Sequence, residues 1–244
     1  MKTKLKTLAM VATVVVLTAG MVAGEEEEVS GNSSNSSSGG GSDAPAGFVD
    51  LGLPSGLLWA TCNVGATTPE GYGDYYAWGE TSTKTTYNWT TYRYGTVDAS
   101  GELDALTKYS LYGMHQLNDG RTTLESEDDA ATAVLGGGAR TPTKTEWEEL
   151  LENTTNEWAT VNDVNGWKFS AANGNNIFLP AAGKYYGSTL ENAGTFGYYW
   201  SSTLDTTSTS YARLYGFSEN GHGMGSIYNR YYGFTVRAVR DSQK

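Results

Sequence analysis

One thiol and two histidines are the side chains in this sequence best suited to nucleophilic or metal chemistry. Cys62 is the only cysteine among 244 residues, so an intrachain disulfide and a cysteine-based metal site are both excluded. A catalytic thiol would need a histidine partner, and neither His115 nor His222 stands at a recognisable spacing from it. We therefore expect Cys62 to be a small buried apolar residue.

Two groups of carboxylates could supply the acid–base pair of a hydrolase. They are Glu125, Glu127, Asp128 and Asp129, and then Glu146, Glu148 and Glu149. The first group lies at the start of a predicted helix, where acidic side chains complement the helix dipole. The second lies on the solvated face of another predicted helix. We therefore expect no catalytic residue, no cofactor and no metal ion, although an enzyme remains an alternative.

The segment 205–230 is rich in Ser, Thr, Asn, Gly and Tyr, and it lies between two strand-like runs. This residue mixture is typical of adaptable binding surfaces, and Tyr and Arg are frequent binding anchors. His222, between two glycines, is expected to be an exposed contact rather than a metal ligand. An ordinary polar hairpin loop is the alternative. The predicted ligand-binding residues are Tyr211, Arg213, Tyr215, Asn220, His222, Tyr228 and Asn229.

The net charge of −11 limits the possible partners. A chain this acidic repels phosphate backbones and anionic membrane surfaces, so nucleic acid is not an expected partner. We expect an unknown protein or glycan ligand, bound through 205–230.

The amino-terminal residues predict export. Lys2, Lys4 and Lys6 precede an apolar run at 8–19, which indicates a secretory signal peptide over 1–24. The run is shorter than the roughly 20 residues that cross a bilayer, so no transmembrane segment is expected in the mature chain. An acidic and Ser/Asn/Gly-rich linker at 25–46 then precedes one domain at 47–240. We expect the protein at the cell surface or secreted.

Two short helices are expected to position these residues. In the first, over 127–134, Ser126 is the predicted cap. The second should begin after Thr143, because Thr143 follows a proline and forms a capping box with Glu146. It should run to about Asn153. Trp147 in this second helix is expected to be a core anchor.

The rest of the domain is predicted to be β-rich. Expected strands are 48–53, 57–64, 166–172, 176–180, 196–204, 211–218, 223–228 and 231–239, with irregular structure at 81–110. Asn173-Gly174 predicts a hairpin turn between the third and fourth of these strands. The expected class is α+β, with mostly short antiparallel strands and loops and about two short helices.

Ordered blocks along the domain resemble a large paralogous family of exported proteins from gut Bacteroidetes and Fibrobacter. The blocks are at 49–56, 59–66, 73–80, 128–131, 141–150, 178–183, 197–202 and 231–240. That family is similar in fold to the formylglycine-generating, sulfatase-modifying enzymes, so the resemblance implies a C-type-lectin-like fold. The run Arg140-Thr141-Pro142-Thr143-Lys144-Thr145-Glu146-Trp147-Glu148 is close to the Arg-Leu-Pro-Thr-x-x-Glu-Trp-Glu motif of those enzymes.

The sequence departs from the functional residues of both related groups. It has no cysteine after position 62, so the thiol oxidation of the enzymes cannot occur. It also has no Glu-Pro-Asn, Gln-Pro-Asp or Trp-Asn-Asp, so calcium-mediated sugar binding is not expected. The apolar run ends in Leu17-Thr18-Ala19-Gly20, which resembles a lipoprotein box with Gly20 in place of the lipidated Cys.

In related C-type-lectin-like proteins, a diversity-generating retroelement varies the carboxyl-terminal stretch. The resemblance therefore implies a variable protein whose ligand surface, 205–230, differs from copy to copy. A carbohydrate-binding module of fixed specificity is the alternative. A sulfatase-modifying-enzyme-like catalyst that has lost its cysteines is the less favoured third hypothesis.

Overall fold

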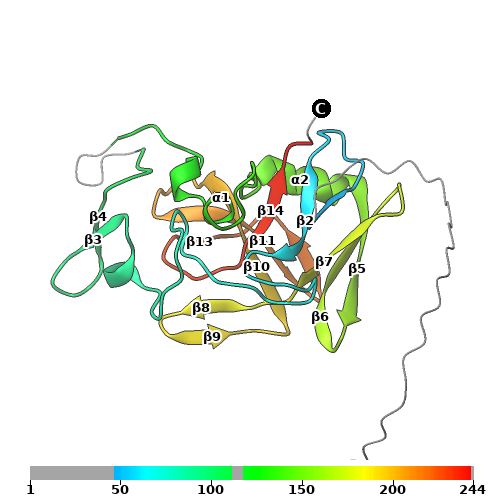
Figure 1. Cartoon of the computed structure of the whole chain (residues 1–244). Helices are drawn as coiled ribbons and strands as arrows, with labels where there is room; N and C mark the ends of the chain where they lie inside the picture. The colour runs from blue at the N-terminus through cyan, green and yellow to red at the C-terminus, as the bar shows by residue number, and fades with distance from the viewer. Residues whose placement is uncertain (1–46, 112–117, 243–244) are drawn as a thin grey trace, which may run out of the picture. The chain divides into compact units, whose positions relative to one another are not determined.

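Short antiparallel strands and long connections dominate the computed structural model, which describes residues 47–111 and 118–242 (Figure 1). Over these residues there are two α-helices, so the α+β class is confirmed at this level. None of the described helices is both long and apolar enough to cross a membrane. The predicted signal peptide and linker, and His115, lie outside the described residues.

The helical elements are few and short. They are the 3₁₀ turns η1 (Trp89–Thr91) and η2 (Ser126–Asp128), and the α-helices α1 (Ala130–Leu135) and α2 (Lys144–Asn153).

The strands form several small sheets with antiparallel pairing. One sheet joins the two ends of the domain: β1 (Phe48–Asp50), β2 (Leu58–Asn63) and β14 (Arg237–Arg240). A second contains β5 (Thr154–Val161), β6 (Val164–Ala171) and β7 (Asn176–Pro180). A third contains β10 (Phe196–Leu204) and β11 (Tyr211–Ser218), with β12 (Gly221–Gly223) and β13 (Ile227–Asn229) both pairing with β11. Two hairpins complete the set: β3 (Gly95–Val97) with β4 (Leu103–Leu106), and β8 (Lys184–Tyr186) with β9 (Thr189–Glu191).

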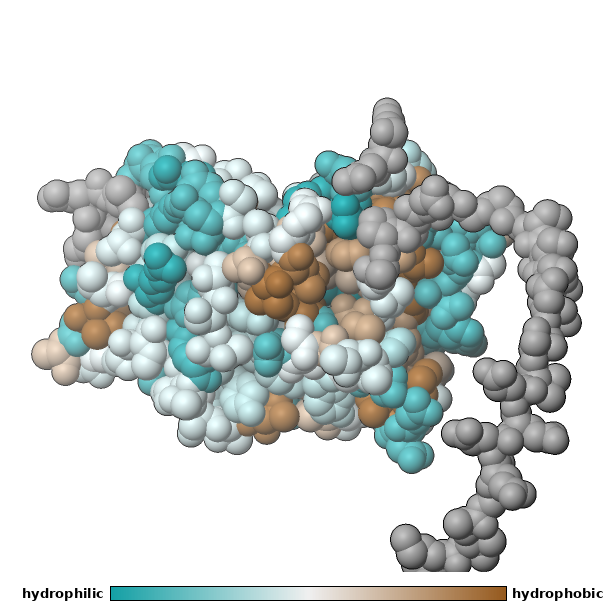
Figure 2. Space-filling model, viewed as in Figure 1, coloured by the Kyte–Doolittle hydropathy of each residue, from teal (hydrophilic) through white to brown (hydrophobic). Residues whose placement is uncertain are grey.

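The core consists largely of aromatic side chains in two clusters. In one, the indole of Trp147 lies 4.9 Å from Trp59 and stacks 4.9 Å from Tyr215, measured between ring centroids. In the other, Trp200 stacks on Phe234 at 4.2 Å. On the face that Figure 2 shows, hydrophobic residues form small patches separated by polar surface. The apolar surface is therefore mostly used inside the domain.

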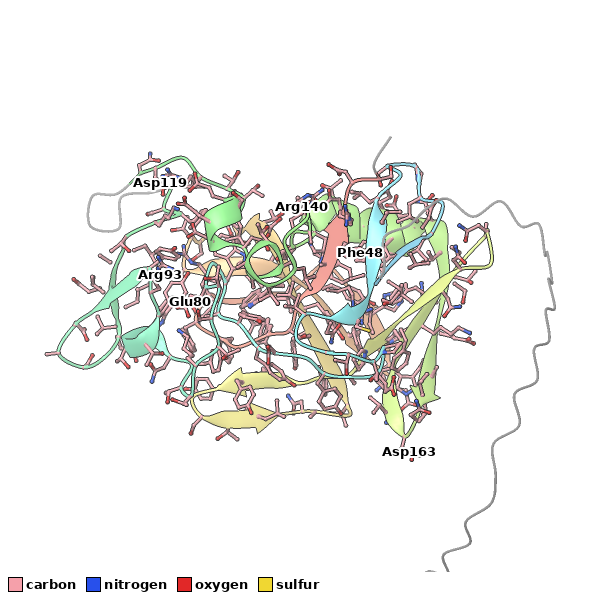
Figure 3. All side chains as sticks on the ribbon, in the orientation of Figure 1. Phe48, Glu80, Arg93, Asp119, Arg140 and Asp163 are labelled. Atoms are coloured by element: carbon pink, nitrogen blue, oxygen red, sulfur yellow. The ribbon has the colours of Figure 1, made fainter. Side chains whose placement is uncertain are left out.

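The predicted second helix is confirmed. Thr143 and Glu146 form the expected capping box, in which each side chain accepts a hydrogen bond from the backbone N–H of the other. Trp147 is fully buried, as predicted. Arg140 lies beside this helix (Figure 3) and binds Glu146 through two hydrogen bonds of 2.6 and 2.7 Å. The Arg-Thr-Pro-Thr run thus fixes the start of α2.

The first predicted helix needs correction. It begins at Ala130 rather than near Glu127, and its cap is Asp129 instead of Ser126. The Asp129 carboxylate accepts from two backbone N–H groups at the helix start, Ala131 and Thr132, whereas Ser126 begins a 3₁₀ turn. A carboxylate that satisfies two helix N–H groups is the stronger cap.

The carboxyl-terminal strands also differ from their predicted bounds. The single strand predicted at 223–228 is two short strands, because β12 pairs with residues 216–218 of β11 and β13 pairs with residues 211–213. In the strand predicted at 231–239, only Arg237–Arg240 is regular, and Phe234 and Thr235 make isolated bridges.

The region 81–110, predicted irregular, contains the β3–β4 hairpin. Cys62 is half-buried rather than buried, and its sulfur lies 3.7 Å from the Thr61 hydroxyl.

Candidate ligand-binding groove

A shallow groove of about 430 Å³ opens over the third sheet, inside the segment predicted to bind a ligand. Its walls come from the start of β10, the end of β11, the strand β12 and the connection to β13. Aromatic rings and glycines dominate the lining, which consists of Phe196, Tyr198, Gly216, Phe217, Ser218, Gly221, His222, Gly223, Gly225, Ser226 and Tyr228.

Three glycines leave the polypeptide backbone bare along this groove. A Cβ atom added at Gly221, Gly223 or Gly225 would meet no atom within 4 Å. Gly221 has a φ of 158°, a backbone conformation that side chains other than glycine rarely adopt, whereas Gly223 and Gly225 lie outside the positive-φ region. Gly197 shows the opposite situation, because a Cβ there would lie 2.0 Å from the Phe217 ring. Glycine is therefore required by packing at 197 and by backbone conformation at 221, but by neither at 223 or 225.

His222 is exposed on β12, as predicted, with its imidazole 4.4 Å from the indole of Trp167. Burial by the neighbouring rings lowers the pKa of His222 below 6.5. A neutral imidazole can donate one hydrogen bond and accept another. His222 can therefore offer a ligand both functions at neutral pH.

Tyr228 and Asn229 lie on β13, and both are half-buried. The Tyr228 ring forms a groove wall and packs edge-on against Tyr198 at 5.6 Å. Asn220 is exposed in the turn between β11 and β12. Of the predicted residues, His222 and Tyr228 line the groove, while Asn220 and Asn229 lie on the same segment.

Arg213 and Tyr211 are at the other end of β11. Arg213 is half-buried and forms an ion pair with the buried carboxylate of Asp205, with a nitrogen–oxygen distance of 2.8 Å. It lines a second hollow of about 370 Å³, which shares Gly225 with the groove and is lined also by Lys144, Glu148, Leu151, Glu152 and Met224. Tyr211 is half-buried and pairs with Asn229 across the strands. Neither residue lines the groove itself.

The prediction for Tyr215 is wrong. Its side chain is 0% exposed and stacks on Trp147 in the core, with ring planes 18° apart. The strand β11 lies between β10 and the pair β12 and β13, and Leu214 and Tyr215 are both buried. Adjacent residues of a strand point to opposite faces, so β11 is covered on both faces here. Tyr215 cannot contact a ligand.

Sequence reasoning missed Phe196 and Tyr198, which form one wall of the groove from β10. These residues precede the polar segment and lie within an apolar strand pattern. The usable signal was their alternation with Gly197, which places both rings on one face of β10. Phe196 is 41% exposed, which an apolar run alone does not indicate.

The acidic residues near α1 form an ion-pair cluster. The ammonium group of Lys108 lies 2.6–2.8 Å from carboxylate oxygens of Glu125, Glu127 and Asp128. Burial alone would raise the pKa of Asp128, but hydrogen bonds from Lys108, Tyr109 and Tyr94 lower it. The three carboxylates are near enough to one another to hold a cation, and Lys108 already supplies the positive charge.

A buried arginine holds the end of the groove segment in place. The guanidinium of Arg230 is fully buried among the rings of Trp78, Tyr92 and Tyr109. It donates to the Tyr92 hydroxyl at 2.8 Å and to the carbonyls of Lys108, Tyr109 and Thr209 at 2.9–3.0 Å. Arg230 thus fastens the residue after β13 to two distant segments.

The groove lies within the part of the chain that matches a sequence-family model. Residues 147–239, from α2 to β14, match a family model described as a domain of unknown function (DUF8237). Searches of curated proteins and of solved structures gave no match. The groove-bearing sheet is therefore similar to a recurring domain.

Proposed function

We propose that this protein is an exported, non-enzymatic binding module of the C-type-lectin-like fold, which binds its ligand in the groove over β10, β11 and β12. The observation that carries the proposal is the bare groove floor. Glycine is entropically unfavourable in ordered structure, and Gly→Ala at a compatible backbone position stabilises a protein by about 0.4–1 kcal/mol. Two glycines that line this groove, Gly223 and Gly225, are at such positions, because neither the space around them nor a positive φ requires glycine.

A bare floor lets a ligand reach the peptide groups. Exposed N–H and C=O groups are obligatory hydrogen-bonding partners, and a methyl group at each position would narrow the groove. The walls add aromatic surface from Phe196 and Tyr228, and a donor and acceptor from His222. This combination of apolar surface and a few convergent polar groups is typical of ligand sites.

The topology and one motif support the proposed fold. Pairing of the early strand β2 with the last strand, β14, in one sheet closes the domain on itself. The Arg140 to Glu148 run occupies the start of α2, where its Arg140–Glu146 pair and capping box are structural. This agrees with a shared helix that carries no chemistry of its own.

The proposed absence of catalysis is supported by the ion pairs that the candidate acid–base carboxylates form. The carboxylates Glu125, Glu127 and Asp128 bind Lys108, and Glu146 binds Arg140. Cys62 lies on β2, and the contact recorded for its sulfur is with the Thr61 hydroxyl at 3.7 Å.

The proposal is tested with the full chain and two single substitutions, Gly223→Ala and Gly225→Ala. The probes are a glycan array and a random displayed-peptide library. We expect ligands that bind the native protein and lose at least tenfold in affinity with either variant, while Tm stays equal or rises. Thr107→Ala is the control for a surface change to alanine, because Thr107 is exposed and does not line the groove. Ligands that bind both groove variants with the same affinity as the native protein would refute the groove as the binding site.

We also propose that a retroelement diversifies the residues around this groove. Asn220, His222, Ser226 and Ile227 are exposed, so substitution there leaves the buried core intact. Sequencing this gene across a population should show variation at these codons and constancy at 231–240. Invariant codons at 205–230, with no near-copy of the segment and no reverse transcriptase gene close by, would leave a binding site of fixed specificity. Mass spectrometry of the mature amino terminus tests export.

A further inference from the structure

Five aromatic rings form a continuous row that begins in the groove and leaves it. We call this row the aromatic ladder; it consists of Phe196, Tyr198, Tyr228, Tyr232 and Tyr186. Successive ring centroids are 6.1, 5.6, 5.2 and 5.3 Å apart. The row connects β10, β13, the chain after Arg230 and the β8–β9 hairpin, which are far apart in the sequence.

A lysine holds the middle of the ladder together. The Lys184 ammonium lies 4.9 Å from the ring centroids of Tyr228 and Tyr232 and 5.6 Å from that of Tyr198. Cation–π contacts of this kind attract each ring to the same charge. Lys184 and Tyr186 are two residues apart on β8, so they lie on one face of the hairpin and both meet Tyr232. The position of the rings is therefore fixed before any ligand binds.

The two ends of the ladder are its most exposed rings. Phe196 is 41% exposed and Tyr186 is 48% exposed, while Tyr228 and Tyr232 are half-buried and Tyr198 lies beneath them. The half-buried Tyr228 and Tyr232 connect the two exposed end rings, so the accessible aromatic surface is narrow and long. A ligand that covers it must itself be long and narrow.

We propose that the aromatic ladder binds a neutral oligosaccharide chain, with one end of the chain in the groove and the other on Tyr186. This inference rests on the proposed function, and it names the ligand class and a second part of the site. The steps between rings are comparable with the length of one sugar unit. The C–H groups of a sugar carry partial positive charge and are attracted to the negative face of an aromatic ring, while tyrosine hydroxyls can bond the sugar hydroxyls.

Charge argues for a neutral chain. The protein carries a net charge of −11, which repels a polyanion. The one cation in the ladder, Lys184, is already engaged by three rings and by Glu191 at 3.6 Å. The ladder therefore offers no free positive charge for a sulfate or carboxylate.

The test measures affinity against chain length. The probes are the sugar units of three neutral polysaccharides, glucan, mannan and xylan. Each is supplied as the monosaccharide, the disaccharide and the hexasaccharide, and each is titrated by calorimetry against the full chain. The variants are Tyr186→Ala and Phe196→Ala, at the two ends of the ladder. Leu190→Ala is the matched control, because Leu190 is 38% exposed on the same hairpin but pairs with Tyr185 on its opposite face.

We expect at least one hexasaccharide to bind at least tenfold more tightly than its monosaccharide. We expect Tyr186→Ala to remove about tenfold of that affinity, which is about 1.4 kcal/mol, and Leu190→Ala to leave it unchanged. A hexasaccharide that binds but keeps its full affinity in Tyr186→Ala would overturn the ladder. If no glycan binds while the groove captures a peptide in a Gly225-dependent way, this inference fails and the proposed function stands. If neither probe class binds, both fail.

Discussion

Replacement of Arg230 by methionine should strongly destabilise the domain. The variant Arg230→Met keeps an unbranched apolar stem but is shorter than arginine and removes every donor. The carbonyls of Lys108, Tyr109 and Thr209 then lose their hydrogen bonds to the guanidinium. The Tyr92 hydroxyl is less affected, because it still donates to the Trp78 carbonyl at 2.8 Å.

The size of the effect follows from these three carbonyls. A buried acceptor left unsatisfied costs about 1–3 kcal/mol. We take the lower end, because methionine also removes the desolvation cost of a buried charge. Three carbonyls then give a loss of about 3 kcal/mol in the free energy of unfolding, or about 6–12 °C in Tm for a domain of this size.

Thermal unfolding followed by circular dichroism, with urea unfolding beside it, measures this loss. Arg93→Met is the control, because Arg93 is exposed and its guanidinium lies over the Tyr94 ring at 5.3 Å. An exposed cation–π contact contributes about 0.5–1 kcal/mol. If Arg230→Met lowers Tm by less than Arg93→Met, the three carbonyls have found other donors, and Arg230 is not the anchor we describe.

Three further outcomes can be measured on the same protein. Tyr215→Phe should change the free energy of unfolding by less than about 1 kcal/mol, because no described protein group accepts from or donates to its buried hydroxyl; a loss of 2 kcal/mol or more in urea unfolding would contradict this. Thr143→Ala should lower it by about 1 kcal/mol, since it removes the cap of α2, and Thr→Ser at the same position should restore most of the loss. The pKa of His222, followed by NMR titration, should lie below 6.5 and move toward 6.5 in Trp167→Ala, because burial is the cause of the shift. With a lowered pKa, the contribution of the His222 imidazole to the free energy of unfolding is complete above pH 6.5 and falls as the pH drops through that pKa. A measured pKa above 6.5 would reverse this pH dependence.

Local signals made part of the fold predictable. The helix α2 follows from its capping box, and the β6–β7 hairpin follows from Asn173-Gly174, where Gly174 has a φ of 89°. Each depends on residues within one turn of the chain. The α1 boundary was wrong by three residues because Ser126 and Asp129, three positions apart, are both residue types that cap helices, and only the hydrogen bonds decide between them.

Non-local contacts account for what could not be predicted. The division of 223–228 into β12 and β13 depends on which part of β11 each residue meets, which no local pattern specifies. Composition identified the groove through His222 and Tyr228, but it also selected Tyr215, which has the same residue type in a buried place. Lys184 was missed because its role comes from rings on three other segments.

The pairing of β2 with β14 has a consequence for protein synthesis. The strand β14 is translated after the groove segment, yet it supplies the partner of a strand near the start of the domain. A ribosome that stops within 205–230, through a nonsense codon or a frameshift, releases a chain without Arg230, Phe234 and Val239. Such a chain lacks the buried side chains that complete both core clusters and should be degraded. Both core clusters are therefore complete only in chains that have been translated through the whole groove segment and β14.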